Sequence, residues 1–529
     1  MWYLCYFIHR HLDFRIAEVE SLARIAGCCS SVDDSNPRSP PPPPPPSPPS
    51  PPPSPRLAWR LPDGDHPDSP FWFVDLPSND AALAIVRRGI LLKGVFEVWG
   101  EGATYDELEN SVKSYLTVEK EKTAAYLTAG SSFKIVVDGF GKIFSMQEQI
   151  QRIERLSYIP FQGKVNLKSP DHKFWLIESV VGEGVNNGLP PRVPRRIYFA
   201  REVGCSNRTI VSTYTLSKRR YLGPTSMDAE MAFIMANQAL AMAGKLIYDP
   251  FVGTGSVLIA AAHYGAYTVG ADIDIRVVRD GRGRDRNIWS NFQQYGLMPP
   301  LSLLRVDNNV NPWRTDLDEV FDSVLCDPPY GVRAGGRKSG GRKMLNGRVE
   351  PYVIPEEMKS DHIPSTAPYT LEECLQDMLD MASRLLVMGG RLVFFFPVLR
   401  EEYKEEEDLP RHACLHLVAN SEQILTRRWS RRLLTYEKVT RYTADMAKEA
   451  RAKHEYFRIN HLKFLEEARA KADLRAAVFA PRRAEWFPDL ESGSPSMDGG
   501  GGGDGTVNGA NEHSVATAAR RPRYRGKNV

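Results

Sequence analysis

Between residues 245 and 440, short apolar segments alternate with stretches of helical pattern, and this alternation constrains the fold more than any other feature of the chain. The apolar segments are KLIYDP (245–250), AYTVGADI (266–273), FDSVLCDPP (321–329) and GRLVFFFPVL (390–399). Apolar runs of this length, separated by helices, are typical of parallel strands buried on both faces. The sequence therefore predicts an α/β domain with a doubly wound, Rossmann-like sheet, which we place at residues 225–442.

The rest of the chain supplies further modules, since 529 residues are enough for about three domains. Strand and helix patterns alternate in two α+β modules before the α/β domain, and charged, helix-prone sequence follows it. The predicted boundaries are 1–95 and 96–205 for the α+β modules, 206–224 for a linker, 443–489 for a charged helical extension and 490–529 for a disordered, glycine-rich tail with a basic end.

A proline-rich stretch interrupts the first module. Residues 37–55 hold 14 of the 40 prolines and predict an extended polyproline segment that packs into no core. Such a segment is either a ligand for a proline-recognising domain or a solvated loop insertion. We favour the insertion, because helical sequence (13–27) precedes it and a strand pattern (71–76) follows it.

Composition excludes several classes of protein. The formal net charge is only +3, from 68 Lys+Arg and 65 Asp+Glu, so any nucleic-acid surface must come from local patches. The seven cysteines form no CxxC pair, which argues against structural zinc or a disulfide scaffold and for a reducing compartment. The sequence has no apolar run of about 18 residues and no basic leader, so we expect a soluble, intracellular protein without a membrane span or secretory signal.

The first candidate site is a glycine turn after the first apolar segment, in YDPFVGTGS (248–256). A strand ends at Asp249, and Gly253 and Gly255 allow a tight turn and close approach of a ligand. Many strand-to-helix turns need glycine for the turn alone. The spacing matches neither the dinucleotide fingerprint nor a P-loop. An acidic strand end with a short glycine turn favours a cofactor without pyrophosphate, namely S-adenosylmethionine.

Two more acids follow the next apolar segments. Asp272 ends the second strand, where a carboxylate can accept both ribose hydroxyls of an adenosine. Asp307, with Asn308, follows the third strand and can take the adenine amino group, although a turn-forming Asp-Asn pair explains these residues almost as well. Three acids at successive strand ends strengthen the prediction of a cofactor site.

The strongest motif is Asp327-Pro328-Pro329-Tyr330, directly after the strand FDSVLC. The two prolines fix an extended turn and remove two backbone donors, leaving the Asp327 carboxylate and the Pro328 carbonyl as acceptors. Such a pair can hold the two hydrogens of a base's exocyclic amine, with Asp327 assisting proton removal. Tyr330 offers a face for stacking the base. The alternative is a rigid turn with an incidental aromatic residue.

The order DPFVGTGS, GADID, VDNN and DPPYG resembles the amino-methylating class I S-adenosylmethionine-dependent methyltransferases. Over most of its length the chain resembles the catalytic subunits of eukaryotic tRNA (guanosine-10 N2)-methyltransferases, for example in HRHLDFRIAEVESLA, KRRYLGPTSMDAEMAFIMANQAL and RRLLTYEK. The resemblance implies a ferredoxin-like domain at 1–95 and a THUMP-like RNA-binding domain at 96–205. It also implies a small zinc-binding activator subunit as partner, tRNA as substrate and a cytoplasmic location.

The resemblance also assigns roles to individual residues. The implied cofactor-binding residues are Asp249, Pro250, Phe251, Gly253 and Gly255 on the methionine side, Thr225 and Ser226 nearby, Asp272 at the ribose, and Asp307 and Asn308 at the adenine. The implied catalytic residues, which would receive the target base, are Asp327, Pro328, Pro329 and Tyr330. No metal site is implied.

Basic residues supply candidate phosphate contacts. Solvated loops explain most of them about as well, but contact is favoured for the run at 333–343, because this loop directly follows the Asp-Pro-Pro-Tyr motif, where an RNA strand would have to approach. The candidates are Arg195, Arg196, Lys218, Arg219, Arg220, the run Arg333, Arg337, Lys338, Arg342 and Lys343, and the segment RRWSRR (427–432). A helix is predicted over residues 226–241, with Ser226 as its cap.

Two other functions remain open on sequence grounds. One is an adenine N6-methyltransferase acting on RNA or DNA, because the Asp-Pro-Pro-Tyr motif suits either amine. The other is a tRNA-binding scaffold without turnover, which the intact Asp249, Asp272 and Asp327 disfavour.

Overall fold

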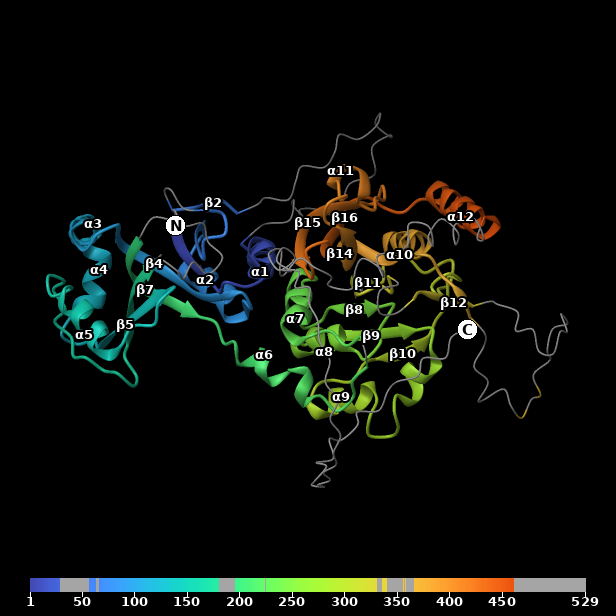
Figure 1. Cartoon of the computed structure of the whole chain (residues 1–529), viewed down its shortest axis with the longest axis horizontal. Helices are drawn as coiled ribbons and strands as arrows, with labels where there is room; N and C mark the ends of the chain where they lie inside the picture. Colours follow the sequence, from blue (N-terminus) through green and yellow to red (C-terminus); the bar gives the residue numbers. More distant parts are fainter. Residues whose placement is uncertain are drawn as a thin grey trace, which may run out of the picture. The chain divides into compact units, whose positions relative to one another are not determined.

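The computed structural model describes residues 1–28, 57–62, 66–179, 196–223, 225–330, 335–339, 355, 357 and 366–460 (Figure 1). The predictions for the polyproline segment at 37–55, for residues 461–489 of the helical extension and for the tail at 490–529 lie outside these residues. Within the described residues, no helix is long and apolar enough to cross a membrane.

The C-terminal sheet has seven strands in the order β10-β9-β8-β11-β14-β16-β15. The first five are parallel, whereas β16 is antiparallel to both β14 and β15. The strands are β8 (Leu246–Asp249), β9 (Tyr267–Asp272), β10 (Ser302–Arg305), β11 (Phe321–Cys326), β14 (Leu386–Leu399), β15 (Leu415–Ile424) and β16 (Trp429–Lys438). This arrangement confirms the predicted α/β class with a Rossmann-like sheet.

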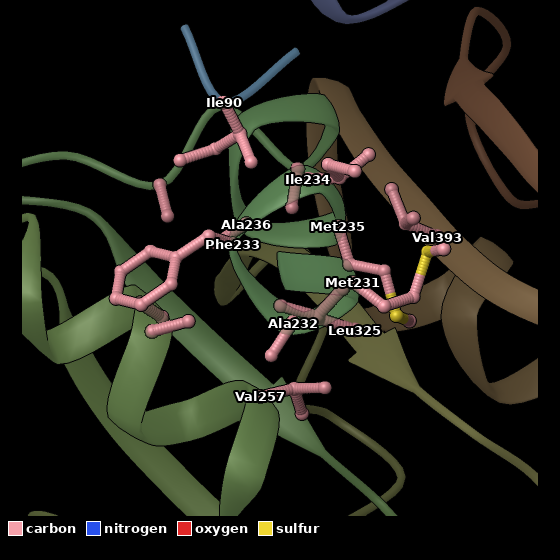
Figure 2. Packing of buried hydrophobic residues seen from close by; sticks show 14 of the residues in the cluster. Ile90, Met231, Ala232, Phe233, Ile234, Met235, Ala236, Val257, Leu325 and Val393 are labelled. Carbon is pink, nitrogen blue, oxygen red and sulfur yellow. The ribbon is translucent and has the colours of Figure 1, made fainter. Parts of the chain in front are cut away.

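Both faces of this sheet are covered, because successive strand residues point to opposite sides. Ile247, Leu325 and Val393 belong to one apolar cluster, and their neighbours Tyr248, Val324 and Leu392 belong to another. Helices α7 (Ala229–Gln238), α8 (Ser256–His263) and α9 (Ile288–Gln294) contribute to the first cluster, and α10 (Leu371–Leu385) contributes to the second. Figure 2 shows Met231 and Met235 of α7 lying toward Leu325 and Val393 of the sheet.

Short elements complete this part of the chain. They are α6 (Thr209–Thr213), the 3-10 turn Leu216–Lys218, the π-helical turn Arg276–Asp280, the small hairpin β12 (Arg337–Ser339) with β13 (Thr366–Pro368), α11 (Glu405–Asp408) and α12 (Ala444–Ile459). Two of them, α6 and the 3-10 turn, lie in the predicted linker, and α12 is the described part of the predicted helical extension.

The N-terminal half is built on a second seven-stranded sheet, in the order β2-β3-β1-β4-β7-β6-β5, with only β5 and β6 parallel. Its strands are β1 (Trp2–Phe7), β2 (Trp59–Arg60), β3 (Phe71–Asp75), β4 (Leu92–Gly102), β5 (Phe133–Phe140), β6 (His172–Ser179) and β7 (Arg196–Cys205). Its helices are the 3-10 turn Leu12–Phe14, α1 (Arg15–Ile25), α2 (Asn79–Arg88), α3 (Tyr105–Val118), α4 (Lys120–Leu127) and α5 (Met146–Glu154).

The predicted division at residue 95 falls inside β4, which pairs with β1 on one side and β7 on the other. The two predicted α+β modules therefore share one sheet. Whether they fold as separate domains stays a prediction.

A buried polar contact joins the N-terminal half to the C-terminal half. Glu18 of α1 is fully buried and accepts hydrogen bonds from the backbone of Ile90 (2.9 Å) and Leu91 (2.9 Å) and from Asn237 of α7 (2.7 Å). Burial raises the pKa of Glu18, while the three hydrogen bonds and Arg88 oppose that rise. One carboxylate thus satisfies three buried donors from both halves.

The start of α7 differs from the prediction. Asp228, not Ser226, caps the helix, because its side chain accepts from the backbone amide of Met231 (3.0 Å). The Ser226 hydroxyl instead contacts the Thr254 hydroxyl (2.8 Å) and accepts from the backbone amide of Gly223 (2.9 Å). The predicted cap was wrong because both Ser226 and Asp228 have side chains suited to a cap, and Ser226 instead contacts Thr254.

Candidate active site

The site lies where the chain reverses its direction across the C-terminal sheet. From β8 the chain adds β9 and β10 on one side, and it then returns to add β11 on the other side of β8. The carboxyl ends of β8 and β11 therefore flank a topological switch point, where parallel α/β sheets bind ligands. Asp249 ends β8 and Asp327 follows β11, so two of the predicted residues lie at this point.

The glycine turn leads from β8 into α8. Gly253 and Gly255 have positive φ angles of 49° and 78°, which favour glycine, and Gly255 is the N-cap of α8. The backbone amide of Gly255 donates to the carbonyl of Val252 (2.7 Å), and the amide of Val252 donates to the carbonyl of Ala271 (2.8 Å). The second contact fixes the turn against the end of β9.

Asp272, at the end of β9, is tied directly to the glycine turn. Its carboxylate accepts from the backbone amides of Gly253 (3.2 Å) and Asp274 (2.9 Å). Burial raises its pKa, and these amides oppose the rise. The sequence assigned Asp272 and the glycine turn to one cofactor site, and the structure brings the two together.

Asp249 is buried, and its carboxylate accepts from the backbone amide of Phe251 (2.9 Å). Burial raises its pKa well above the ordinary value, and the negative charges of Asp272 and Asp327 add to the rise. Asp249 thus lies close enough to both Asp272 and Asp327 to feel their charges. A cationic ligand relieves such like-charge repulsion, and S-adenosylmethionine carries a sulfonium cation, so this set of carboxylates and loop amides fits that cofactor.

Asp307, the predicted acid at the end of the third strand, lies in the loop after β10. Asp307 accepts from the backbone amides of Asn309 (3.0 Å) and Ser339 (2.6 Å), and Asn308 donates to the carbonyl of Pro250 (2.9 Å). Asn308 thus joins this loop to the turn after β8. The contact between Asp307 and Asn309 is also that of a local turn, so both interpretations of the pair stay open.

Thr225 and Ser226 lie before α7. Ser226 reaches the glycine turn through its contact with Thr254, whereas Thr225 is exposed. The neighbouring residue Tyr221 is held by Asn291, which also donates to the carbonyl of Thr254 (3.3 Å).

The Asp-Pro-Pro-Tyr corner carries the most informative contacts. Arg431 of β16 donates to the Asp327 Oδ2 atom (3.0 Å) and to the Tyr330 hydroxyl (3.2 Å). Asp327 Oδ1 is buried and has no hydrogen-bond partner among the described residues. Burial raises the pKa of Asp327, and Arg431 and Tyr330 oppose the rise. The corner therefore holds one neutralised oxygen and one acceptor that a ligand's N–H group can satisfy.

Sequence reasoning misplaced three of the basic residues. Arg219 is buried and donates to the Ser256 hydroxyl (2.6 Å), and Lys338 is buried in an ion pair with Glu373. Neither is available to a phosphate. Arg431 was grouped with the phosphate contacts, yet it lies against Asp327, and its role in the site was missed. Arg431 begins the segment RRLLTYEK, which carries part of the resemblance, but no sequence signal pointed to its contact with Asp327, because that contact depends on the pairing of β16 with β14.

Among the other candidates, Lys218, Arg220 and Arg337 are exposed, and Arg196 lies near Glu101 (3.8 Å). Arg427 and Arg428 are also exposed. Their contacts with phosphates stay a prediction, as do those of Arg195, Arg333, Arg342 and Lys343, which lie outside the described residues.

This fold and this arrangement of carboxylates define a Rossmann-like methyltransferase with an acceptor corner for an amine. Two family models match the chain: the Tmrp11 THUMP N-terminal domain at residues 64–208 and the RMKL-like methyltransferase domain at residues 217–346. The second match spans the strand ends from Asp249 to Tyr330.

The tRNA (guanine(10)-N(2))-methyltransferase TRMT11 of Mus musculus is 37% identical over 451 residues, covering 83% of this chain and 88% of the relative. The Dictyostelium discoideum protein of the same name is 34% identical over 452 residues, covering 83% and 82%. The crystal structure of TrmN from Thermus thermophilus is 16% identical with a TM-score of 0.35, covering 83% of this chain and 100% of that chain. The chain belongs to the family of tRNA (guanine(10)-N(2))-methyltransferases, which confirms the family that the motifs predicted.

Proposed function

We infer that this protein transfers a methyl group from S-adenosylmethionine to the exocyclic 2-amino group of guanosine 10 in tRNA. The observation that carries the inference is the Asp327 corner at the switch point, where one carboxylate oxygen is paired with Arg431 and the other, which is buried, has no partner among the described residues. Family membership identifies the amine as that of guanine rather than adenine. When bound, S-adenosylmethionine supplies an electrophilic methyl group on its sulfonium.

We propose that the glycine turn and the strand ends hold this cofactor. Asp249, Pro250, Phe251, Gly253 and Gly255 would face its methionine part, with Thr225 and Ser226 nearby. Asp272 would accept from the ribose hydroxyls, and Asp307 with Asn308 would contact the adenine. The hydrogen bonds from Gly253 to Asp272 and from Asn308 to Pro250 support this assignment, because they join these elements into one loop cluster.

Asp327 to Tyr330 would receive the target base. Asp327 Oδ1 and the Pro328 carbonyl accept the two amine hydrogens, which orients the nitrogen lone pair toward the methyl group. The raised pKa of Asp327, caused by burial, makes its carboxylate a better proton acceptor for the amine. Tyr330 stacks on the base, and a guanosine in a paired stem must first leave its stack.

The function is tested with purified protein, its zinc-binding activator subunit, unmodified tRNA and tritium-labelled S-adenosylmethionine. We expect labelled N2-methylguanosine after digestion to nucleosides, and no label in a tRNA whose guanosine 10 and its pairing partner are exchanged for an A-U pair. Labelled N6-methyladenosine would contradict the proposed substrate, and tRNA binding without any methyl transfer would contradict catalysis.

Replacing Asp272 with alanine is expected to weaken S-adenosylmethionine binding by about 1–3 kcal/mol, the range for hydrogen bonds to a charged group. Isothermal titration calorimetry with S-adenosylhomocysteine measures the change without turnover. The matched control is Asp316→Ala, because Asp316 is exposed and paired with Arg314 (2.7 Å). If the Asp272→Ala variant and the wild type bind S-adenosylhomocysteine with equal affinity, the assignment of Asp272 to the cofactor site is contradicted.

We also propose the small zinc-binding activator as a partner and the cytoplasm as the compartment. Exposed apolar side chains beside the edge strand β10, at Met298 (51%), Leu301 (59%) and Val310 (63%), support a partner surface on the methyltransferase half. Buried free thiols at Cys5, Cys326, Cys374 and Cys414 support a reducing compartment.

A further inference from the structure

Arg431 makes a set of contacts to which the resemblance assigned no role. It lies on β16, and its guanidinium donates to Asp327 Oδ2 (3.0 Å) and to the Tyr330 hydroxyl (3.2 Å). Asp327 and Arg431 are 104 residues apart in the sequence. Both partners belong to the corner that receives the base, one as amine acceptor and one as stacking surface.

The guanidinium itself is held in place from two further directions. Its Nε atom donates to Gln423 of β15 (2.6 Å), and its central carbon lies 3.7 Å from the centre of the Phe395 ring of β14. Its side chain is only 11% exposed. An arginine is suited to this place, because its planar fork can donate to several acceptors at once while its face stacks on an aromatic ring.

We propose that Arg431 is a positioning residue for methyl transfer: it fixes Asp327 and Tyr330 so that Asp327 Oδ1 is presented to the amine of the target base. The proposal rests on the proposed function. Because Arg431 occupies Oδ2 and Oδ1 has no partner among the described residues, the rotation of the carboxylate is set and one oxygen is reserved. The same guanidinium sets the position of the tyrosine ring.

The charges around this pair determine how it responds to pH. Asp249, Cys326, Tyr330 and Arg431 face Asp327 from β8, β11, the corner itself and β16, and Asp228 at the start of α7 also acts on Arg431. Burial raises the pKa of Asp327, whereas Arg431 lowers it. Loss of the guanidinium charge therefore lets Asp327 take up a proton at higher pH.

The test compares Arg431→Met and Arg431→Lys with the wild type in complex with the activator. For Arg431→Met we expect kcat to fall about 100-fold, the size of effect that a misplaced reacting group causes. We expect the acid limb of its pH profile to move to higher pH and the affinity for S-adenosylhomocysteine to stay within about twofold, since the proposal places no Arg431 contact at the cofactor. Arg431→Lys keeps the charge but not the fork, so its acid limb should stay near that of the wild type while kcat remains reduced.

Arg384→Met is the matched control. Arg384 is also 11% exposed and lies near a carboxylate, that of Asp318 (3.6 Å). It lies at the end of α10, next to the amino end of β14, whereas Asp327 follows the carboxyl end of the parallel neighbour β11. This variant should keep kcat and the pH profile of the wild type. Hydrogen–deuterium exchange supplies a readout that needs no turnover: peptides covering residues 321–330 should exchange faster in Arg431→Met and not in Arg384→Met.

Wild-type kcat in Arg431→Met, an unmoved acid limb or unchanged exchange over 321–330 would each overturn the positioning role. The proposed function and the positioning role of Arg431 fail in different ways. A wild-type enzyme that methylates no tRNA contradicts the proposed function. The hydrogen–deuterium exchange measurement would still report whether Arg431 orders the corner.

Discussion

Asp327→Ala is expected to lower methyl transfer to tRNA by at least about 10³-fold, while S-adenosylhomocysteine binds nearly as tightly as to the wild type. The substitution removes the acceptor of the amine and its proton acceptor together, and a positioned proton acceptor alone contributes about 10²–10⁴-fold. It leaves the Gly253–Asp272 contact of the proposed cofactor site in place. Label transfer from tritiated S-adenosylmethionine measures the loss, and calorimetry measures the affinity.

Asp327→Asn separates the two roles of the carboxylate. Its amide oxygen can still accept a hydrogen bond, but it cannot take a proton and carries no charge for Arg431. We expect activity between those of the wild type and Asp327→Ala. An Asp327→Ala enzyme with more than a tenth of wild-type kcat would show that another group accepts the amine.

Glu18→Ala is expected to lower the free energy of unfolding by about 4 kcal/mol, because it removes a fully buried side chain that accepts three hydrogen bonds. The truncation leaves the amides of Ile90 and Leu91 without their acceptor, leaves Asn237 with only its longer contact to the Arg88 carbonyl (3.4 Å), and opens a cavity where the side chain was. Urea denaturation followed by tryptophan fluorescence gives the change.

Glu109→Ala is the control for this measurement. Glu109 lies on the exposed side of α3 in an i,i+4 pair with Lys113, and its side chain is 37% exposed. We expect its loss to cost no more than about 1 kcal/mol, as for other surface pairs. Similar midpoints for Glu18→Ala and Glu109→Ala would mean that the buried carboxylate adds no more than a surface pair does.

Much of the fold and part of the site could be predicted because the relevant signals are local. An apolar strand that ends in an acid, as in KLIYD and FDSVLCD, places that acid at the carboxyl ends of the parallel strands, where ligands bind. This inference needs no knowledge of distant contacts. Asp249 accordingly lies within electrostatic reach of both Asp272 and Asp327.

The misplaced residues depend on contacts between segments that are far apart in the sequence. Lys338 is predicted as a phosphate contact in the basic run at 333–343, yet it pairs with Glu373 of α10. Arg431 shows no distinguishing pattern in RRLLTYEK, because its orientation depends on the register that sets it opposite Pro397 of β14. Charge in a sequence is visible, but the partner that neutralises it is not.

The late position of β16 in the chain has a consequence for any shortened form of this protein. A fragment of residues 217–346 contains every strand-end motif from Asp249 to Tyr330, but it lacks β14, β15 and β16. Such a fragment would contain all of the motifs from which the site is predicted. It would still lack the Arg431 guanidinium beside Asp327 and the Phe395 ring on which that guanidinium stacks. During synthesis, likewise, the corner is finished only once about a hundred further residues have left the ribosome after Asp327.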